Sequence, residues 1–226
     1  LVTAAFVVLI GGWQRYLAAI AGAAMVVALL LETLTPGVSW SPYYKVQTKE
    51  LTSAGVPLTD ISVNGVPHQI MRAAAQRLQE EPQYGLPYER TPGNPLRNVL
   101  IIGAGSGSDV AITLAKGAKQ VDAVDIDPRI MQLGLEKHPD HPYDNPLVTR
   151  HVNDGRAYLE AVDTKYDLIL FALPDSLALV TGASQIRLES FLFTEQALKA
   201  AKEHLTPEGA FAMYNYYRED WLIDRL

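Results

Sequence analysis

The stretch Asn98–Asp109 reads NVLIIGAGSGSD, in which an apolar run passes directly into a glycine-rich turn and then into a helical pattern. This order predicts a short buried strand, a tight turn and the first turn of a helix. Glycines at 103, 105 and 107 let the backbone approach a ligand closely, while the following helix directs its amino end at it. The stretch therefore predicts a ligand-binding loop at the carboxyl end of a strand.

The spacing of these glycines distinguishes between two classes of ligand. A dinucleotide fingerprint, G-x-G-x-x-G/A, requires a small apolar residue at position 108, where this chain has Ser108. The observed G-x-G-x-G spacing fits an adenosylmethionine-type loop better, so an NAD-dependent enzyme is a poorly supported alternative. A glycine-rich turn after a strand also serves packing alone, and the loop by itself does not decide the ligand.

Strands and helices alternate from residue 97 onward. Strands are predicted at 99–102, 121–127, 148–154, 166–173 and 209–217, and helices at 109–117, 128–138, 155–162 and 194–205, the last with Thr194 as its N-cap. This alternation predicts an α/β fold, a Rossmann-like parallel sheet with both faces covered by helices. Ligands of such sheets bind beyond the carboxyl ends of the strands, near the point where the strand order reverses.

Three successive strand ends carry residues suited to a nucleoside. The first ends in the glycine loop, the second ends at Asp125, and the third ends at Asp154. Asp125 is positioned to accept hydrogen bonds from ribose hydroxyls, and Asp154 from an adenine amino group. Each acid alone is more often a turn or a helix cap, but together the three ends predict nucleoside binding.

The amino-terminal third is unusually apolar. Residues 1–12 and 17–31 carry no charged side chain, and the range from Trp13 to Leu34 has the roughly 20 residues that a membrane-crossing helix needs. We expect a membrane hairpin or the last part of a longer membrane bundle. A buried core helix is the alternative, whereas a signal peptide is disfavoured because no basic segment precedes the apolar run.

Residues 35–96 are expected to form a small β region with a helix and a linker. Strands are predicted at 41–51 and 61–70, the second turning at the hairpin dipeptide Asn64-Gly65, followed by a helix at 68–81 and a loop at 82–96. The expected domains are thus 1–34, hydrophobic membrane segment; 35–96, β region; and 97–226, nucleoside-binding domain.

Bulk composition excludes several classes of function. The net charge of −6 and the absence of a Lys/Arg cluster argue against nucleic-acid binding, and the absence of cysteine excludes thiolate chemistry and Cys-ligated metal. No metal site is expected. His138 and His141 lie close together in KHPDHPYDNP, which we interpret as a surface turn because zinc needs three or four convergent ligands.

The chain resembles the spermidine synthase-like proteins, the polyamine aminopropyltransferases, over most of its length. The segments that carry the resemblance are SPYYKV (41–46), ISVNGV, NVLIIGAGSGSD, VDAVDID, NDGRAYL, YDLIL and LFTEQALKAAKEHLTPEGAF. The resemblance implies a class I adenosylmethionine-dependent methyltransferase fold preceded by a small β domain, and some bacterial members carry amino-terminal membrane spans.

The resemblance also implies the roles of particular residues. The co-substrate, adenosylmethionine or its decarboxylated form, would be held by Gly103, Gly105, Ser106, Gly107, Asp125, Ile126, Asp154 and Gly155. The acceptor, a small-molecule amine, would be held by Tyr43, Tyr44, Asp175 and Ser176, with Asp175 as the candidate catalytic residue.

Three departures from the family pattern bear on activity. Ser106 stands where the family loop has an aspartate near the amine end of the donor, and residues 68–76 lack the acceptor-binding acids. In FALPDS (171–176), the family motif Asp-x-x-Asp-Pro places its base on Ala172 and its second acid on Asp175. Since an attacking amine must lose a proton, and Ala172 cannot take it, the usual base is missing.

The leading interpretation is a membrane-associated transferase with its catalytic domain on the cytoplasmic side. A methyltransferase and a non-catalytic nucleoside-binding domain of a membrane protein stay open as alternatives, as does assembly as a homodimer. The sequence begins inside an apolar run and ends at WLIDRL, so we expect a fragment of a longer protein, truncated at the carboxyl end.

Overall fold

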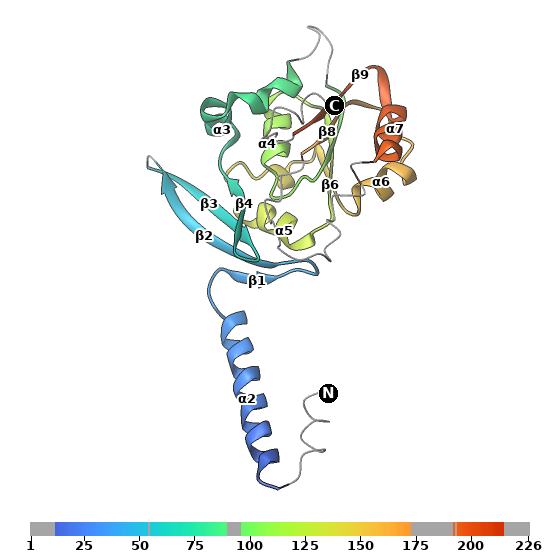
Figure 1. Ribbon diagram of the computed structural model, residues 1–226. Coiled ribbons are helices and arrows are strands. Elements are labelled where there is room, and N and C mark those ends of the chain that lie inside the picture. Colours follow the sequence, from blue (N-terminus) through green and yellow to red (C-terminus); the bar gives the residue numbers. More distant parts are fainter. Residues whose placement is uncertain (1–11, 54, 90–95, 173–191, 193, 215–226) are drawn as a thin grey trace, which may run out of the picture.

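The computed structural model describes residues 12–53, 55–89, 96–172, 192 and 194–214. These residues form a parallel sheet covered by helices, an antiparallel sheet beside it, and one helix that projects away from both (Figure 1).

The parallel sheet has the order β7-β6-β5-β8-β9. Its strands are β5 (Asn98–Ile102), β6 (Gln120–Asp125), β7 (Val148–Val152), β8 (Tyr166–Phe171) and β9 (Leu205–Met213). Every neighbouring pair is parallel, and the strand order reverses between β5 and β8. The predicted Rossmann-like fold is confirmed, and each of the five predicted strands is present with bounds that differ by at most four residues from those expected.

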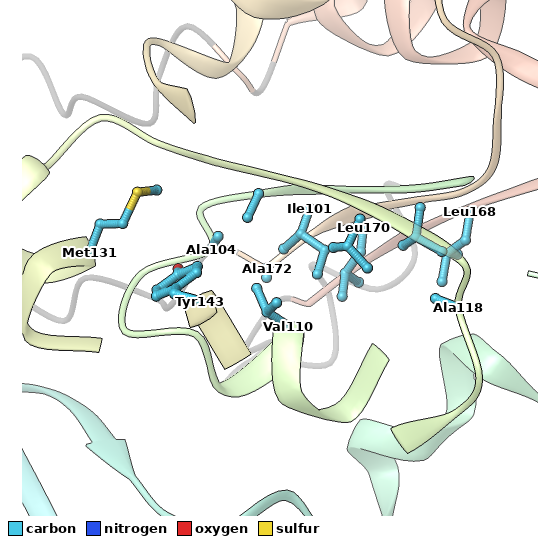
Figure 2. Packing of buried hydrophobic residues seen from close by; sticks show 12 residues of the cluster. Ile101, Ala104, Val110, Ala118, Met131, Tyr143, Leu168, Leu170 and Ala172 are labelled. Carbon is cyan, nitrogen blue, oxygen red and sulfur yellow. The ribbon is translucent and has the colours of Figure 1, made fainter. Parts of the chain in front are cut away.

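Helices cover both faces of this sheet because apolar side chains leave the buried strands on both sides. They are α4 (Ser108–Ala115), α5 (Pro128–Lys137), α6 (Gly155–Ala161) and α7 (Glu195–Glu203). One core cluster joins Ile101, Leu168 and Leu170 to Val110 of α4, as Figure 2 shows. The cluster on the opposite face joins the sheet to Leu159 of α6 and Ala201 of α7.

The antiparallel sheet runs β1-β2-β3-β4 and packs against α5. Its strands are β1 (Val38–Trp40), β2 (Lys45–Ser53), β3 (Val56–Val63) and β4 (Val66–Met71). The predicted hairpin turn is confirmed: Asn64 and Gly65 both have positive φ, 51° and 81°, between β3 and β4. Burial of Val46, Ile61 and Met71 against Ile130 and Leu133 of α5 holds this sheet to the rest of the molecule.

Two sequence predictions in this region are wrong. The predicted helix at 68–81 overlaps the predicted strand at 61–70; residues 68–71 belong to the strand, and the helix α3 spans only Ala74–Glu80. The predicted loop at 82–96 contains the 3₁₀ helix η1 (Pro82–Tyr88). The helix propensity of this segment is overridden because β4 pairs with β3 as far as Met71, which the pairing buries completely. A second 3₁₀ helix, η2 (Pro142–Asp144), precedes β7.

The helix α2 spans Gln14–Thr33 and stands apart from the body (Figure 1). Within the part of the chain that the structure describes, it is the one helix long and apolar enough to cross a membrane, with a mean hydropathy of 1.9 and none of its span buried. Its final turn is joined to the antiparallel sheet by an ion pair between Glu32 and Lys45.

Candidate functional site

A pocket of about 670 Å³, partly open to solvent, lies where the two sheets meet. The parallel sheet contributes the ends of three strands: Ile102 and Gly103 after β5, Asp125 and Ile126 after β6, and Asn153 to Gly155 after β7. The antiparallel sheet contributes Tyr44, His68 and Gln69. The remaining lining residues are Val124, Asp127, Ile130 and Leu192. The pocket therefore occupies the position at which such sheets bind ligands.

The glycine loop is held by hydrogen bonds to both backbone polar groups of Gly105. Its N–H donates to Asp125 Oδ2 at 2.7 Å, and its carbonyl accepts from the Tyr143 hydroxyl at 2.8 Å. The next N–H, of Ser106, donates to Gln69 Oε1 at 2.9 Å. Gly105 has φ +53°, in the left-handed region that glycine adopts readily. These three hydrogen bonds restrict the conformation of the loop.

Close backbone packing around the loop depends on two further glycines. A Cβ atom at Gly134 in α5 would lie 2.3 Å from the carbonyl oxygen of Ser106. A Cβ atom at Gly155 would lie 2.3 Å from Cγ2 of Ile102. Only glycine lets α5 reach the loop and α6 reach the end of β5. Of these contacting residues, Ile102 and Gly155 line the pocket.

Asp125 organises the loop and also faces the pocket. Its Oδ1 accepts from the N–H of Asp127 at 2.8 Å, while Oδ2 accepts from Gly105. Burial raises the pKa of Asp125 to about 6, against the lowering effect of these backbone hydrogen bonds. Each carboxylate oxygen has a second acceptor site, so the side chain retains the capacity to accept from a ligand hydroxyl.

The other two acids of the pocket cap helices. Asp127 Oδ1 accepts from the N–H groups of Arg129 and Ile130 at the start of α5. Asp154 Oδ1 accepts from the N–H of Ala157 at the start of α6. Asp154 therefore has the capping role that was the alternative to ligand binding, and its place in the pocket wall allows both roles.

The wall formed by the antiparallel sheet is made of side chains. The rings of Tyr44 and His68 lie 6.2 Å apart, and Gln69 reaches across to the glycine loop. A Cβ atom on Gly105 would meet Nε2 of Gln69 at 2.3 Å, so the amide covers the loop closely. His68 and Gln69 were not predicted as site residues. The pairing of β3 with β4 shifts register between Ile61, the partner of Gln69, and Ser62, the partner of Pro67, so His68 is an extra residue there. This irregularity lets two consecutive side chains line the pocket.

The structure brings some predicted site residues to the pocket and not others. Gly103, Asp125, Ile126, Asp154, Gly155 and Tyr44 line it. Gly105, Ser106 and Gly107 form the loop beneath it without lining it, and Tyr43 lies outside it. Ser106 is buried, and within the described structure its hydroxyl has no hydrogen-bond partner. Asp175 and Ser176 lie outside the described residues, as do the rest of the range 173–191 and the carboxyl-terminal range 215–226.

Ala172 lies at the end of β8, adjacent to the glycine loop. Its N–H donates to the carbonyl of Ile102 at 2.9 Å, and its methyl group packs in the core beside Ile101 and Val110, as Figure 2 shows. Ala172 is buried and does not line the pocket, so its methyl group contributes to the core rather than to the site.

A buried polar cluster lies beside the amino end of α4. Asp109 accepts from the hydroxyl of Tyr214 at 3.1 Å, and Tyr88 shares a hydrogen bond of 2.7 Å with Thr113. Burial raises the pKa of Asp109 to about 6. This cluster joins η1, α4 and the end of β9, which the sequence did not predict.

The loop between α5 and β7 also differs from its prediction. His138 is fully buried rather than at the surface, and its Nδ1 accepts from the N–H of Asp140 at 3.2 Å. Burial lowers the pKa of His138 to about 4. Asp140 in turn accepts from the N–H of Ala74 at 2.6 Å, which ties α3 to this loop. Among the residues described, His, Asp and Glu form no group that would hold a metal ion.

Comparisons with known proteins agree with this geometry. Residues 84–223, more than half of the chain, match the spermine/spermidine synthase domain family. A polyamine aminopropyltransferase of Clostridium perfringens (strain SM101 / Type A) is 36% identical over 81 residues, 34% of this chain and 29% of that protein. One of Alkaliphilus metalliredigens is 29% identical over 126 residues, 54% of this chain and 41% of that protein. The matches thus span less than half the length of these relatives.

Solved structures of the same fold include two spermidine synthases. One, in complex with the transition state analogue AdoDATO, superimposes with a TM-score of 0.59 and 18% identity over 77% of this chain and 57% of that chain. The other, from Thermotoga maritima, gives a TM-score of 0.54 and 17% identity over 77% of this chain and 55% of that chain. At these identities the likeness establishes the fold alone.

Proposed function

The chain belongs to the spermine/spermidine synthase domain family, and from this premise we propose that it is a transferase. Its co-substrate is adenosylmethionine or decarboxylated adenosylmethionine, and it alkylates a small-molecule amine. The family favours transfer of an aminopropyl group. The curated relatives are polyamine aminopropyltransferases, and a spermidine synthase of this fold binds AdoDATO, which supports a sulfonium nucleoside as the donor.

The observation that carries the proposal is the contact between Gly105 and Asp125 at the pocket. It holds the loop and a carboxylate together at adjacent strand ends, where the ribose of a nucleoside would place its hydroxyls. The apolar side chains of Ile126 and Leu192 supply surfaces for the adenine, and Asp154 supplies an acceptor for its amino group. The donor tail then extends along Gly103 toward Gln69.

The transfer step follows from the chemistry of a sulfonium donor. The lone pair of a neutral amine attacks the carbon bonded to sulfur, the C–S bond breaks, and its electron pair remains on sulfur as a neutral thioether. The new C–N bond leaves a proton on the nitrogen, which a base must remove. The apolar methyl group of Ala172 supplies no base, so we assign the proton to Asp175 and the binding of the acceptor amine to Tyr43, Tyr44, Asp175 and Ser176.

Two alternatives share the same donor site. Intact adenosylmethionine would make the enzyme a methyltransferase, and Ser106, in place of an acid near the donor's amine end, favours this reading. A nucleoside-binding domain without catalysis is favoured by the burial of Ala172 in the core. Both alternatives keep the roles of Gly103, Asp125 and Asp154.

We also propose that α2 anchors the enzyme in a membrane. All of its large apolar side chains are about half exposed or more, and burial in a bilayer would remove that surface from water. The proposed division is then a membrane segment at 1–34, the β region at 35–96 and the donor-binding domain at 97–226.

Isothermal titration tests the donor proposal directly. The whole chain in detergent micelles is titrated with intact and with decarboxylated adenosylmethionine, and the D125N variant serves as the control. Binding of the decarboxylated form at least tenfold more tightly supports aminopropyl transfer, and preference for the intact form supports methyl transfer. If neither donor binds, the proposed function is wrong.

A turnover assay distinguishes a catalytic transferase from a non-catalytic nucleoside-binding domain. The donor that binds is incubated with a set of di- and polyamines, and the thioether product and the alkylated amine are measured by mass spectrometry. Product that forms with the wild type and disappears in D175N supports the assigned acceptor site. Tight donor binding without any product over the whole amine set supports the non-catalytic alternative.

A further inference from the structure

The link between α2 and the antiparallel sheet is short and ordered. Four residues, 34–37, separate the end of α2 from β1. The carbonyl of Gly37 accepts from the N–H of Thr48 at 2.8 Å, and the N–H of Val38 donates to Thr35 at 3.0 Å. Gly37 has φ +79°, and a Cβ atom there would lie 2.5 Å from the carbonyl oxygen of Thr48. The link is therefore a fixed turn rather than a free tether.

Side chains reinforce the link on the edge of the sheet that faces α2. Lys45 forms the ion pair with Glu32 of α2, and its ammonium group lies 6.0 Å from the ring centre of Trp40. Trp40 of β1 is the register partner of Lys45 in β2. The end of α2 and the β1–β2 edge are thus one connected structure (Figure 1).

This edge exposes two aromatic rings. Trp40 is 51% exposed and Tyr43 is 38% exposed. Tryptophan and tyrosine are the residues that gather at membrane–water interfaces, where the ring meets the acyl boundary and the N–H or O–H meets water. We name the surface formed by Trp40, Tyr43 and Lys45 the tether edge.

The length of α2 places the tether edge at the surface of a bilayer. Twenty residues in α-helix are about 30 Å long, which equals the thickness of the hydrocarbon core. Because α2 is no longer than the hydrocarbon core is thick, a membrane-spanning α2 ends at the boundary of that core. The four linking residues reach at most roughly 14 Å even when extended, so β1 cannot leave the neighbourhood of the headgroups.

We propose that the tether edge rests in the headgroup layer of the membrane that α2 spans. The occupant is the zwitterionic phospholipid surface, because Lys45 is already paired with Glu32 and contributes no free charge for an anionic lipid. Tyr44, which follows Tyr43 in the chain, lines the pocket. The docking therefore holds the mouth of the pocket beside the bilayer. This inference rests on the membrane anchor proposed above and is independent of the donor.

Tryptophan fluorescence in vesicles tests the docking. The chain has three tryptophans, at 13, 40 and 221, so a variant with W13F and W221F reports on Trp40 alone. The whole chain is reconstituted into phosphatidylcholine vesicles with and without a nitroxide on the headgroup. We expect the nitroxide to lower the Trp40 emission roughly twofold, because the ring lies in the layer that the nitroxide occupies.

A matched control reports on the far side of the body. Leu198 of α7 is 44% exposed, close to the exposure of Trp40, so L198W in a background without other tryptophans gives a ring of similar accessibility. We expect no quenching by the headgroup nitroxide and full quenching by aqueous iodide. Trp40 should show the opposite pattern, and thermal unfolding of each variant verifies that it is folded.

A further experiment distinguishes a wrong docking proposal from a wrong membrane-anchor proposal. A variant with Trp13 alone, the residue that precedes α2, reports whether α2 enters the bilayer at all. Quenching of Trp13 by bromine on the acyl chains, with Trp40 open to iodide and unaffected by the nitroxide, overturns the docking and leaves the anchor standing. If Trp13 is not quenched, both the anchor and the docking are wrong.

Discussion

The two walls of the pocket are built on different principles. The wall from the parallel sheet uses backbone atoms: both polar groups of Gly105 are bonded, and Asp125 accepts from two N–H groups. The wall from the antiparallel sheet uses the side chains of Tyr44, His68 and Gln69. Backbone positions are fixed by the fold and tolerate little change, whereas side chains on a strand face can be exchanged one at a time.

This difference suggests how a family could keep its donor and change its acceptor. The wall from the parallel sheet, which we call the backbone wall, suits the part of the ligand that stays the same. The wall from the antiparallel sheet, the side-chain wall, suits the part that varies. Ser106 lies where the two walls meet, since its N–H donates to the Gln69 side chain of the opposite wall. The predictions below test whether the two walls differ in sensitivity as this account requires.

The largest expected effect comes from filling the space between α5 and the glycine loop. In G134A the new methyl group would meet the carbonyl oxygen of Ser106 at 2.3 Å, so the loop must shift. We expect donor affinity, measured by calorimetry, to fall about a hundredfold. The free energy of unfolding should fall by about 2 kcal/mol, although alanine is the better helix former by about 1 kcal/mol.

G22A is the matched control for this change. Gly22 lies within α2, and a Cβ atom there has no neighbour within 4 Å. Donor affinity should be unchanged. If G134A also binds donor normally, the backbone wall is not the rigid element that we describe.

The free energy of unfolding should depend on pH through the buried His138. Burial lowers its pKa from 6.5 to about 4, so the unfolded chain binds the proton more tightly than the folded one. Stability is therefore lost as pH falls from 6.5 toward 4, by about 2 kcal/mol at pH 5. Denaturant unfolding of the wild type and H138N at pH 7 and pH 5 measures this, because asparagine keeps an acceptor for Asp140 and does not titrate.

Two carboxyl groups change the stability in the opposite direction as pH falls. The effect of His138 is therefore measured as the difference between the wild type and H138N. The pKa values of Asp109 and Asp125 are raised to about 6, so the folded chain holds their protons more tightly and acid favours folding through these groups. H141N, at an exposed neighbour of His138, should follow the wild type at both pH values. If H138N loses as much stability as the wild type at pH 5, the explanation is wrong.

A substitution at Asp125 should weaken the binding of the donor without unfolding the chain. In D125N one acceptor oxygen is replaced by an N–H₂ group, which faces the N–H of either Gly105 or Asp127. We expect donor affinity to fall about tenfold at pH 7. In the wild type, affinity should fall as pH drops through about 6, the pKa of Asp125, because the protonated carboxyl has lost an acceptor.

Calorimetry at pH 7 and pH 5 separates these effects. D125N should bind with similar affinity at both pH values, because the group that titrates is gone. An affinity of D125N that still falls between these values would assign the pH dependence to another group.

The smallest effect is expected on the side-chain wall. The ring of His68 lies beside that of Tyr44 at the pocket, with the ring centres 6.2 Å apart. Donor affinity of H68A should change less than about threefold, while the Michaelis constant for the amine should change more. A loss of donor affinity equal to that of D125N would show that the two walls do not divide their roles.

The sequence predicted the backbone wall well because each part of it is local. Gly103, Asp125 and Asp154 each follow a strand whose apolar run is visible in the sequence, and parallel strands bring their carboxyl ends together. The contributions of Gly134 and Tyr143 were not predicted. A glycine inside a helix and a tyrosine in a loop rich in proline and aspartate have no local pattern that shows their contact with the glycine loop.

The side-chain wall was predicted poorly because it depends on pairing between strands. The strand at 61–70 and its hairpin were predicted, but the overlapping helix prediction at 68–81 obscured the pairing of residues 68–71 with β3, and no local pattern shows the register shift at His68. Tyr44 was predicted from the resemblance, whereas His68 and Gln69 were missed because the register of β4 decides which of its side chains face the pocket. His138 was assigned to the surface because its loop is polar, although it is fully buried.

The fixed turn at Gly37 has a consequence for how substrates reach the enzyme. With the proposed membrane anchor, the body would meet its substrates in a thin layer rather than in a volume. An amine that partitions into that layer would be enriched near the pocket, while a freely soluble amine would gain nothing from the arrangement. The surface density of the amine, rather than its bulk concentration, would then set the rate of encounter.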